Sequence, residues 1–508
     1  MKLYQRPLSP FILLHLIAIL LVGSLPPAQA VPKQMENPFF WINKIKNPNR
    51  LLLTPAEIVK MNEENLKRQD LLLCRVEDLK EEWSKEEIIS FLKEDWEGFG
   101  KRDQVRYGKQ RIPLGDSFWN ALIKNIQQDM LKEKNRLLFG FTLKRTDIRA
   151  FPTEQPSMKT PNSGAFDSFQ LSAIAPGVLV GIYYFSRDNL WAYAQTPFIR
   201  GWIRTKDLAI ANNRDEALAR ESHKAPLVIT GNFVTIFSDL LFKQPVFSAQ
   251  MGSTFPILHE IPSPLVGEGR GEGETDHNHP HLNPPPSRGR IIVGKFPLSK
   301  GDHAAIRNRY VIRIPFRGAD GRLTFRHGYI PAHADVHSGF LPYTQKNMAQ
   351  QAFKMLHQPY GWGEMSGGRD CSRFTMDLLN AFGILMPRNS NHQAKMGFSF
   401  GRLEGKTVEE KKRILDQAVP LATLLRIPGH IMLYLGKHHG VHYAIHSIWG
   451  IQKKGTSGPA YQKIGKVVVT DLNLGKDGPN GSLFHRLTEI QLIGLDSEVN
   501  PVRRDSPF

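Results

Sequence analysis

The stretch that decides the fold covers residues 359–374 and reads PYGWGEMSGGRDCSRF. Its glycine-rich first part is typical of a loop. Apolar residues then recur at helical spacing from Phe374 to Phe382, and Gly383 closes the pattern. The pattern predicts a helix that begins at Cys371.

The position of Cys371 at the start of a helix has a chemical consequence. The free N–H groups and partial positive charge of a helix N-terminus stabilise a thiolate and lower the pKa of a cysteine. The same N–H groups can bind an oxyanion. A buried, inert cysteine is the alternative, but the polar neighbours Asp370 and Ser372 disfavour it. We therefore predict that Cys371 is a nucleophile.

Two downstream histidines are candidates for the base that such a nucleophile needs and for the group that orients the base. His430 opens one predicted strand and His446 lies in the next. If Gly436 pairs with Gly440 across a three-residue loop, His430 faces His446 at a Cβ separation of about 5 Å. Each histidine could instead be an ordinary strand residue. A zinc site formed by Cys371, His430 and His446 is a further alternative.

At these residues the chain resembles the NlpC family of cell-wall cysteine peptidases. The matching pieces are Pro359-Tyr360-Gly-Trp362-Gly, Asp370-Cys371-Ser372, Arg388-x-Ser390-x-x-Gln393, the strand from His430 to Gly436, and Ile445-His446. The combination is far more specific than any one piece, and it implies a papain-like C-terminal domain.

The resemblance implies hydrolysis of peptidoglycan stem peptides between γ-D-glutamate and a diamino acid, through thiolate attack and an acyl-enzyme, with no cofactor and no metal. It also implies that five residues line the substrate groove: Tyr360, Trp362, Asp370, Ser372 and Ser390. The chain departs from the family at Arg373, where a glycine is usual, so that a large cation can crowd or charge the groove. Ile431 and Met432 likewise replace small residues after the histidine.

Two β-rich regions precede this domain. Residues 141–212 contain short runs with strand patterns, broken by Pro, Asn and Ser. They resemble a bacterial SH3-like domain, of the kind that can narrow the groove in relatives and select stems with a free N-terminal L-alanine. The residues that carry the likeness are Arg145-Thr-Asp-Ile-Arg149, Phe166-Asp167-Ser-Phe-Gln170, Trp191 and Gly201-Trp202. Residues 222–342 show a weaker likeness around Gly328 to Pro331, and predict a second such barrel.

Two further segments complete the organisation. Residues 31–140 show helical patterns, with a capping box at Ser84, and resemble the stabilising segment found ahead of such domains. Residues 262–290 are rich in Gly, Pro, Glu and Arg, and we expect a disordered insertion there. Its His277-x-His279-x-His281 run is a weak alternative metal site.

The first thirty residues predict a secretory signal. Lys2 and Arg6 precede an apolar run from Phe11 to Val22, and a small-residue Ala-Gln-Ala site follows at residues 28–30. The run is shorter than the roughly 20 residues that span a bilayer, which disfavours a membrane anchor. We expect an exported protein of the periplasm or cell envelope.

The length, net charge and cysteine content of the chain narrow the range of domain arrangements and binding partners. The chain has 508 residues, too many for one core, and a formal net charge of +18. The positive charge is scattered and matches no nucleic-acid-binding motif, so we expect peptidoglycan or muropeptides as substrate, with peripheral contact to an anionic wall or membrane surface. Cys74 and Cys371 are the two cysteines. A disulfide between them is an alternative to a buried structural Cys74 and a functional Cys371.

The sequence therefore predicts an α+β hydrolase with a helical N-terminal region, two SH3-like barrels and a papain-like domain over residues 343–508. We expect a monomer. A wall-binding protein without activity, and an amidase or acyltransferase on the same papain-like frame, are the alternatives.

Overall fold

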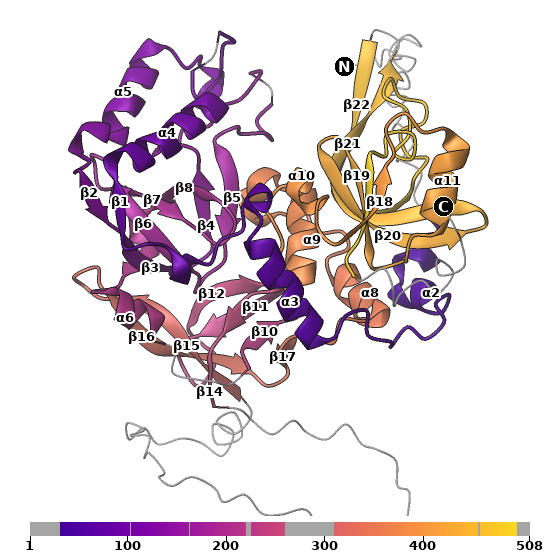
Figure 1. The fold of residues 1–508 in the computed structure, drawn as a ribbon, viewed down its shortest axis with the longest axis horizontal. Coiled ribbons are helices and arrows are strands. Elements are labelled where there is room, and N and C mark those ends of the chain that lie inside the picture. Colours follow the sequence, from indigo (N-terminus) through magenta and orange to yellow (C-terminus); the bar gives the residue numbers. More distant parts are fainter. Residues whose placement is uncertain are drawn as a thin grey trace, which may run out of the picture.

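The computed structural model describes residues 31–101, 103–161, 163–219, 225–259, 309–455 and 458–494. The predicted signal segment and the predicted insertion at residues 262–290, with its three histidines, lie outside the described residues. Three sheet-containing units, joined and partly covered by helices, make up the described chain (Figure 1). Within these ranges no helix has both the length and the apolar character needed to cross a membrane.

The N-terminal part consists mainly of helices, and the sequence contains the signals that start them. Thr54 with Glu57, and Ser84 with Glu87, form complete capping boxes at the two longest helices. The elements are η1 (Lys33–Glu36), α2 (Pro38–Ile42), α3 (Pro55–Leu66), η2 (Gln69–Leu71), η3 (Val76–Asp78), β1 (Glu82–Ser84), α4 (Lys85–Phe99), η4 (Lys109–Arg111), α5 (Asp116–Ile126), η5 (Gln128–Met130) and β2 (Lys134–Arg136).

These helices contribute to two different hydrophobic cores. Trp41 of α2 and Ile58 of α3 are buried in a cluster that includes Phe374 of the C-terminal part. Ile88 of α4 and Trp119 of α5 are buried in a second cluster, with residues of the first β unit. The N-terminal region is therefore held by its neighbours on both sides.

The first β unit is a seven-stranded antiparallel sheet in the order β5-β4-β8-β7-β6-β3-β9. Its core is rich in aromatic residues, and Tyr193 and Trp202 are completely buried there. The elements are β3 (Leu138–Thr142), β4 (Thr146–Arg149), β5 (Gln170–Ile174), β6 (Leu179–Phe185), β7 (Trp191–Gln195), β8 (Arg200–Arg204), η6 (Thr205–Asp207), β9 (Leu208–Ile210) and α6 (Arg214–Leu218).

The second β unit contains a five-stranded sheet, β12-β11-β16-β15-β14, and a three-stranded sheet, β13-β10-β17. Leu227 and Ile330 come from different sheets and share one buried core. The strands are β10 (Leu227–Ile229), β11 (Phe233–Phe237), β12 (Pro245–Gln250), β13 (Thr254–Phe255), β14 (Ile257–His259), β15 (Arg309–Arg317), β16 (Leu323–Pro331) and β17 (Val336–Ser338).

The C-terminal unit packs helices against a six-stranded antiparallel sheet in the order β18-β23-β19-β20-β21-β22. Helix α9 contacts β20 and β21, and it lies between this sheet and the two β units (Figure 1). The elements are α8 (Gln345–Lys354), η7 (Trp362–Gly367), α9 (Cys371–Asn380), α10 (Ser390–Gln393), β18 (Phe398–Arg402), α11 (Val408–Asp416), β19 (Thr423–Ile427), β20 (His430–His438), β21 (Val441–Gly455), β22 (Gly458–Asp471) and β23 (Glu489–Leu492).

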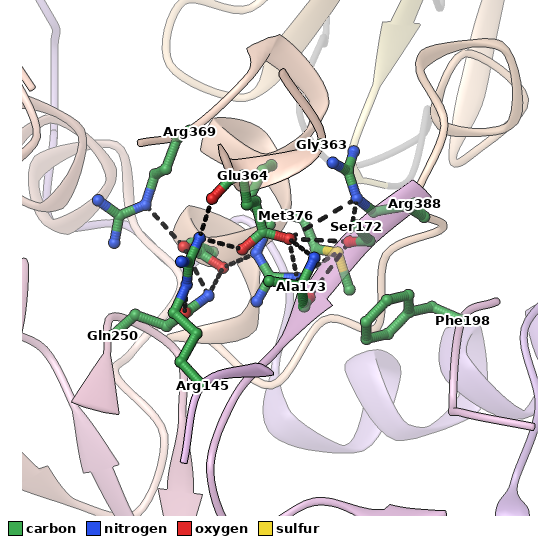
Figure 2. Close-up of polar contacts among 12 residues, drawn as sticks. Arg145, Ser172, Ala173, Phe198, Gln250, Gly363, Glu364, Arg369, Met376 and Arg388 are labelled. Atoms are coloured by element: carbon green, nitrogen blue, oxygen red, sulfur yellow. Dashed lines mark hydrogen bonds and ion pairs between the residues drawn. The ribbon is translucent and has the colours of Figure 1, made fainter. Parts of the chain in front are cut away.

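A buried network of charges joins the first β unit to the C-terminal unit (Figure 2). The Glu364 carboxylate is fully buried and accepts hydrogen bonds from the Ser172 hydroxyl at 2.8 Å and the Ala173 N–H at 2.9 Å. Its ion pairs are with Arg145 at 3.1 Å, Arg373 at 3.2 Å and Arg388 at 3.9 Å. Because a buried charge is tolerated only when it is paired and hydrogen-bonded, this network requires both units to be docked.

The network corrects the expectation for Arg373. Its side chain is buried and does not project into a groove. It binds Asp377 on the same helix at 2.6 Å and donates to the Ala173 carbonyl at 3.3 Å. Asp377 also accepts from Gln250 of the second β unit at 3.1 Å. Arg373 therefore helps to attach α9 to both β units.

Replacing Glu364 by Gln tests the network. The change keeps the shape of the side chain but leaves Arg145 and Arg373 facing a neutral amide, so we expect the free energy of unfolding to fall by about 3 kcal/mol. Thermal unfolding of Glu364→Gln, beside Glu404→Gln at an exposed position, measures the difference. Equal midpoints for the two variants would contradict this role.

Candidate active site

The predicted nucleophile, Cys371, is the first residue of α9, as the sequence predicts. Asp370 caps this helix, because its carboxylate accepts from the Arg373 N–H at 2.9 Å. The Cys371 side chain is 7% exposed, and backbone hydrogen bonds from Ile431 and Ser372 act on its sulfur. The thiol therefore lies beside the first turn of α9 and the start of β20.

The two predicted histidines contact each other, and the backbone N–H of Ile431, the residue after His430, hydrogen-bonds the Cys371 sulfur. His430 Nε2 lies 2.6 Å from His446 Nδ1, and the ring centroids are 4.9 Å apart. His446 Nε2 lies 2.9 Å from the Thr470 hydroxyl. Because Nε2 of His430 is engaged by His446, Nδ1 is the ring nitrogen of His430 left to accept a proton.

The strand register that predicted this meeting is wrong. Leu433 pairs with Ile445, two residues further along β21 than predicted, and Leu435 forms a bulge. The turn has two residues, His439 and Gly440, which both have positive φ as a type I′ hairpin requires. Side chains alternate along a strand with a period of two, so a shift of two residues keeps both histidines on the predicted face.

Burial dominates the electrostatics of the site. Desolvation, followed by the charge of Asp370, raises the pKa of the Cys371 thiol to about 12. Desolvation, followed by the charge of Arg486, lowers the pKa of His430 to about 4, and burial also holds the pKa of His446 well below 6.5. The lowered cysteine pKa expected from the helix N-terminus is therefore wrong for the resting site. These shifts favour a neutral thiol beside a neutral imidazole.

Thr470 is a site residue that the sequence did not reveal. Its hydroxyl can accept a hydrogen bond from Nε2–H of His446. His446 Nδ1 is then an acceptor for Nε2–H of His430, which leaves the lone pair of His430 Nδ1 free to take a proton. Thr470 lies on β22, one strand beyond His446, and only the β21–β22 register brings the two together.

The predicted groove residues differ in their surroundings. Tyr360 is close enough to Cys371 for their charges to interact, and burial raises the pKa of its phenol. Trp362 is 39% exposed, and its indole N–H donates to the Asp167 carbonyl at 2.9 Å. Ser390 is half-buried at the start of α10. Their contact with substrate stays a prediction.

Asp370 and Ser372 are engaged internally. The Asp370 carboxylate accepts from both terminal nitrogens of Arg388, at 2.6 and 3.1 Å, and from the Gly363 N–H at 3.2 Å. Arg388 also donates to the Ser372 hydroxyl at 2.9 Å. Both predicted groove residues therefore fix the start of α9, and their direct role toward substrate stays a prediction.

An aromatic wall lies beside Tyr360 and Trp362. The Phe166 ring, from the first β unit, packs edge-on against Trp362 and against Trp449 of β21, each with centroids 5.3 Å apart. Trp449 in turn contacts Tyr360. The sequence placed Phe166 in the SH3-like resemblance but gave no signal that its ring contacts the C-terminal unit.

Neither alternative role for the cysteines is present in the described structure. Cys74 and Cys371 are both free thiols, and Cys74 is half-buried, so the disulfide does not form. Within the described ranges no group of three His, Cys, Asp or Glu side chains is arranged to hold a metal ion.

Comparison with known proteins identifies two domains. The NlpC/P60 family matches residues 357–466, and the SH3 domain of SH3b1 type matches residues 156–204. The C-terminal unit contains an NlpC/P60 domain. The first β unit contains the SH3b1-type domain. The helices and sheets of the described chain, with these two domains, confirm the expected α+β fold class.

The fold is supported by a solved structure that aligns over most of the chain. An NlpC/P60 endopeptidase from Photobacterium damselae subsp. piscicida aligns over 89% of this chain and 96% of its own, with 17% identity and a TM-score of 0.65. An NlpC/P60 family protein from Bacillus cereus aligns over 63% of this chain and 81% of its own, with 13% identity and a TM-score of 0.39. No curated protein matches the chain.

The lowered histidine pKa predicts acid sensitivity. The pKa of His430 is about 4 in the folded protein and about 6.5 when unfolded, so below pH 6.5 the unfolded chain binds a proton that the folded chain does not. The contribution of the neutral His430 ring to the free energy of unfolding is therefore fully present above pH 6.5 and is lost as the pH falls toward 4. At pH 5 the loss is on the order of 2 kcal/mol.

Thermal unfolding at pH 8 and pH 5 measures this loss. We expect His430→Gln, which removes the titrating ring, to lose less stability between the two pH values than the wild type. The same loss in both proteins would show that His430 is not buried as a neutral imidazole.

Proposed function

We propose that the chain is a peptidoglycan hydrolase that cleaves stem peptides between γ-D-glutamate and a diamino acid, with Cys371 as nucleophile. An NlpC/P60 domain together with an SH3b1-type domain is typical of proteins that act on the cell wall. The observation that carries the proposal is the backbone hydrogen bond from Ile431 to the Cys371 sulfur at the N-terminus of α9, because Ile431 follows His430 of the hydrogen-bonded His430–His446 pair.

The geometry supports a specific order of proton transfers. Because the resting thiol is neutral, His430 Nδ1 takes the thiol proton as the sulfur attacks the carbonyl carbon. We expect the Cys371 N–H at the start of α9 to stabilise the developing oxyanion, since the Arg373 N–H is already bound by Asp370. His430 then gives the proton to the leaving amine, and a thioester remains on Cys371.

Hydrolysis of the thioester completes the cycle. His430 removes a proton from a water molecule, which attacks the thioester carbonyl, and the thiol leaves with a proton from His430. His446 holds the His430 ring through the 2.6 Å contact between Nε2 and Nδ1, and it stabilises the imidazolium when it forms. No cofactor takes part in this sequence.

The position of the SH3b1-type domain supports a preference for stem peptides with a free N-terminus. Phe166 contacts Trp362 and Trp449, so this domain supplies part of the aromatic wall beside the proposed groove. We expect it to narrow the groove and to favour stems with a free N-terminal L-alanine. We also propose that the protein acts in the periplasm or cell envelope, as a monomer, and that it does not bind nucleic acid. Its export stays a prediction.

Mass spectrometry of reaction products tests the proposed function. Mature wild-type protein is incubated with L-Ala-γ-D-Glu-diaminopimelate beside the Cys371→Ala variant. We expect release of L-Ala-D-Glu by the wild type alone, because the alanine side chain has no nucleophilic atom to form the acyl intermediate.

The closest structural control is Cys74→Ala, which removes the other thiol and should cleave like the wild type. If the wild type cleaves neither this tripeptide nor intact peptidoglycan, a wall-binding protein becomes the better description. Transfer of the acyl group to an added amine in place of water would indicate an acyltransferase.

A further inference from the structure

Arg486 is a cation whose charge reaches the proposed base, His430, and no acidic side chain in the described ranges forms a salt bridge with Arg486. It lies in the segment that enters β23, where the Thr488 N–H donates to the Arg426 carbonyl at 2.9 Å. Ile427, the residue after Arg426, pairs with His430 across β19 and β20. Arg486 and His430 therefore lie at the same end of the sheet.

The charge of Arg486 acts on the His430 ring. After burial, the Arg486 guanidinium is the largest influence that lowers the pKa of His430. Arg486 is half-buried, burial lowers the pKa of its own guanidinium, and no carboxylate among the described residues forms a salt bridge with it. A half-buried guanidinium without an anion is suited to bind one from a ligand.

Arg426, unlike Arg486, has an acidic partner among the described residues. Arg426, at the same end of the sheet, donates to the Glu489 carboxylate at 2.6 Å and to the Asn391 side chain at 2.6 Å. Its charge is therefore matched within the protein. Arg486, in contrast, forms no salt bridge with any described carboxylate and remains available to a ligand.

The proposed chemistry places a defined part of the substrate here. His430 must give its proton to the leaving amine, so the residue that carries this amine lies against the His430 ring. The acyl part of the substrate is attached to the sulfur of Cys371, on the other side. Substituents of the leaving residue therefore face the surroundings of His430, which include Arg486.

We propose that Arg486 binds a carboxylate of the leaving-group residue, and so makes the enzyme prefer an acidic diamino acid. The inference rests on the proposed function and names the substrate class of the same site. Either the side-chain carboxylate or the α-carboxylate of that residue can bind Arg486. Both would form the same kind of ion pair with the guanidinium.

Three tripeptides separate these two carboxylates. The first is L-Ala-γ-D-Glu-diaminopimelate, the second has L-Lys as its last residue and lacks the side-chain carboxylate, and the third is the first with an α-carboxamide. We expect kcat/KM of the wild type to be about 10- to 100-fold lower for the peptide that lacks the bound carboxylate, as for loss of a charged hydrogen bond.

The Arg486→Gln variant should lower kcat/KM by the same factor for peptides that keep this carboxylate, and should leave the other peptide unchanged. Arg486→Lys keeps the charge without the two-pronged geometry and should restore part of the loss. Arg413→Gln, an equal loss of charge at an exposed position on α11, is the matched control and should change none of the three values.

The inference is overturned if Arg486→Gln lowers kcat/KM equally for all three peptides, or for none of them. Absence of cleavage by the wild type would instead overturn the proposed function, and the inference with it. Thermal midpoints of the three variants show whether each is folded, and a folded Arg486→Lys variant provides the test if Arg486→Gln does not fold.

Discussion

The ion pair between Asp370 and Arg388 is the interaction on which the candidate site depends. Asp370 caps α9 and so fixes the backbone that presents Cys371. Arg388 holds both oxygens of this carboxylate and also donates to the Ser172 hydroxyl of the SH3b1-type domain at 2.6 Å. Because all three side chains are buried, the pair is satisfied only when the two domains are docked.

Glu364 is a second buried charge whose partners are in place only when the two domains are docked. It lies in the loop between Trp362 and Cys371, and it is bound by Ser172 and Ala173 of the SH3b1-type domain. The loop that leads to the thiol is therefore shaped partly by another domain. This arrangement explains how the SH3b1-type domain can influence chemistry at Cys371 without supplying a reacting group, and why Phe166 can reach the aromatic wall.

Local patterns in the sequence predicted the parts of the site that depend on local structure. The helix at Cys371 followed from apolar spacing and a polar cap, which are properties of consecutive residues. The meeting of His430 and His446 was predicted in spite of a wrong register, since the error of two residues preserved the face of each strand. The NlpC and SH3-like resemblances extended this reading to the fold class.

Contacts between distant elements could not be predicted in the same way. Thr470, Glu364 and Arg373 act through side chains buried between strands or between domains, and no spacing in the sequence marks such contacts. The pKa of Cys371 was misjudged for a related reason: the helix N-terminus was visible in the sequence, but the burial that outweighs it arises from tertiary packing.

The most direct test of the central claim is covalent labelling of Cys371 by a substrate analogue. An L-Ala-γ-D-Glu derivative with an electrophilic ketone in place of the scissile amide is incubated with the wild type, and the modified residue is located by peptide mass spectrometry. The proposed site predicts one adduct, on Cys371, formed much more slowly in His430→Gln. An adduct on Cys74, or equal rates in the two proteins, would contradict a nucleophile assisted by His430.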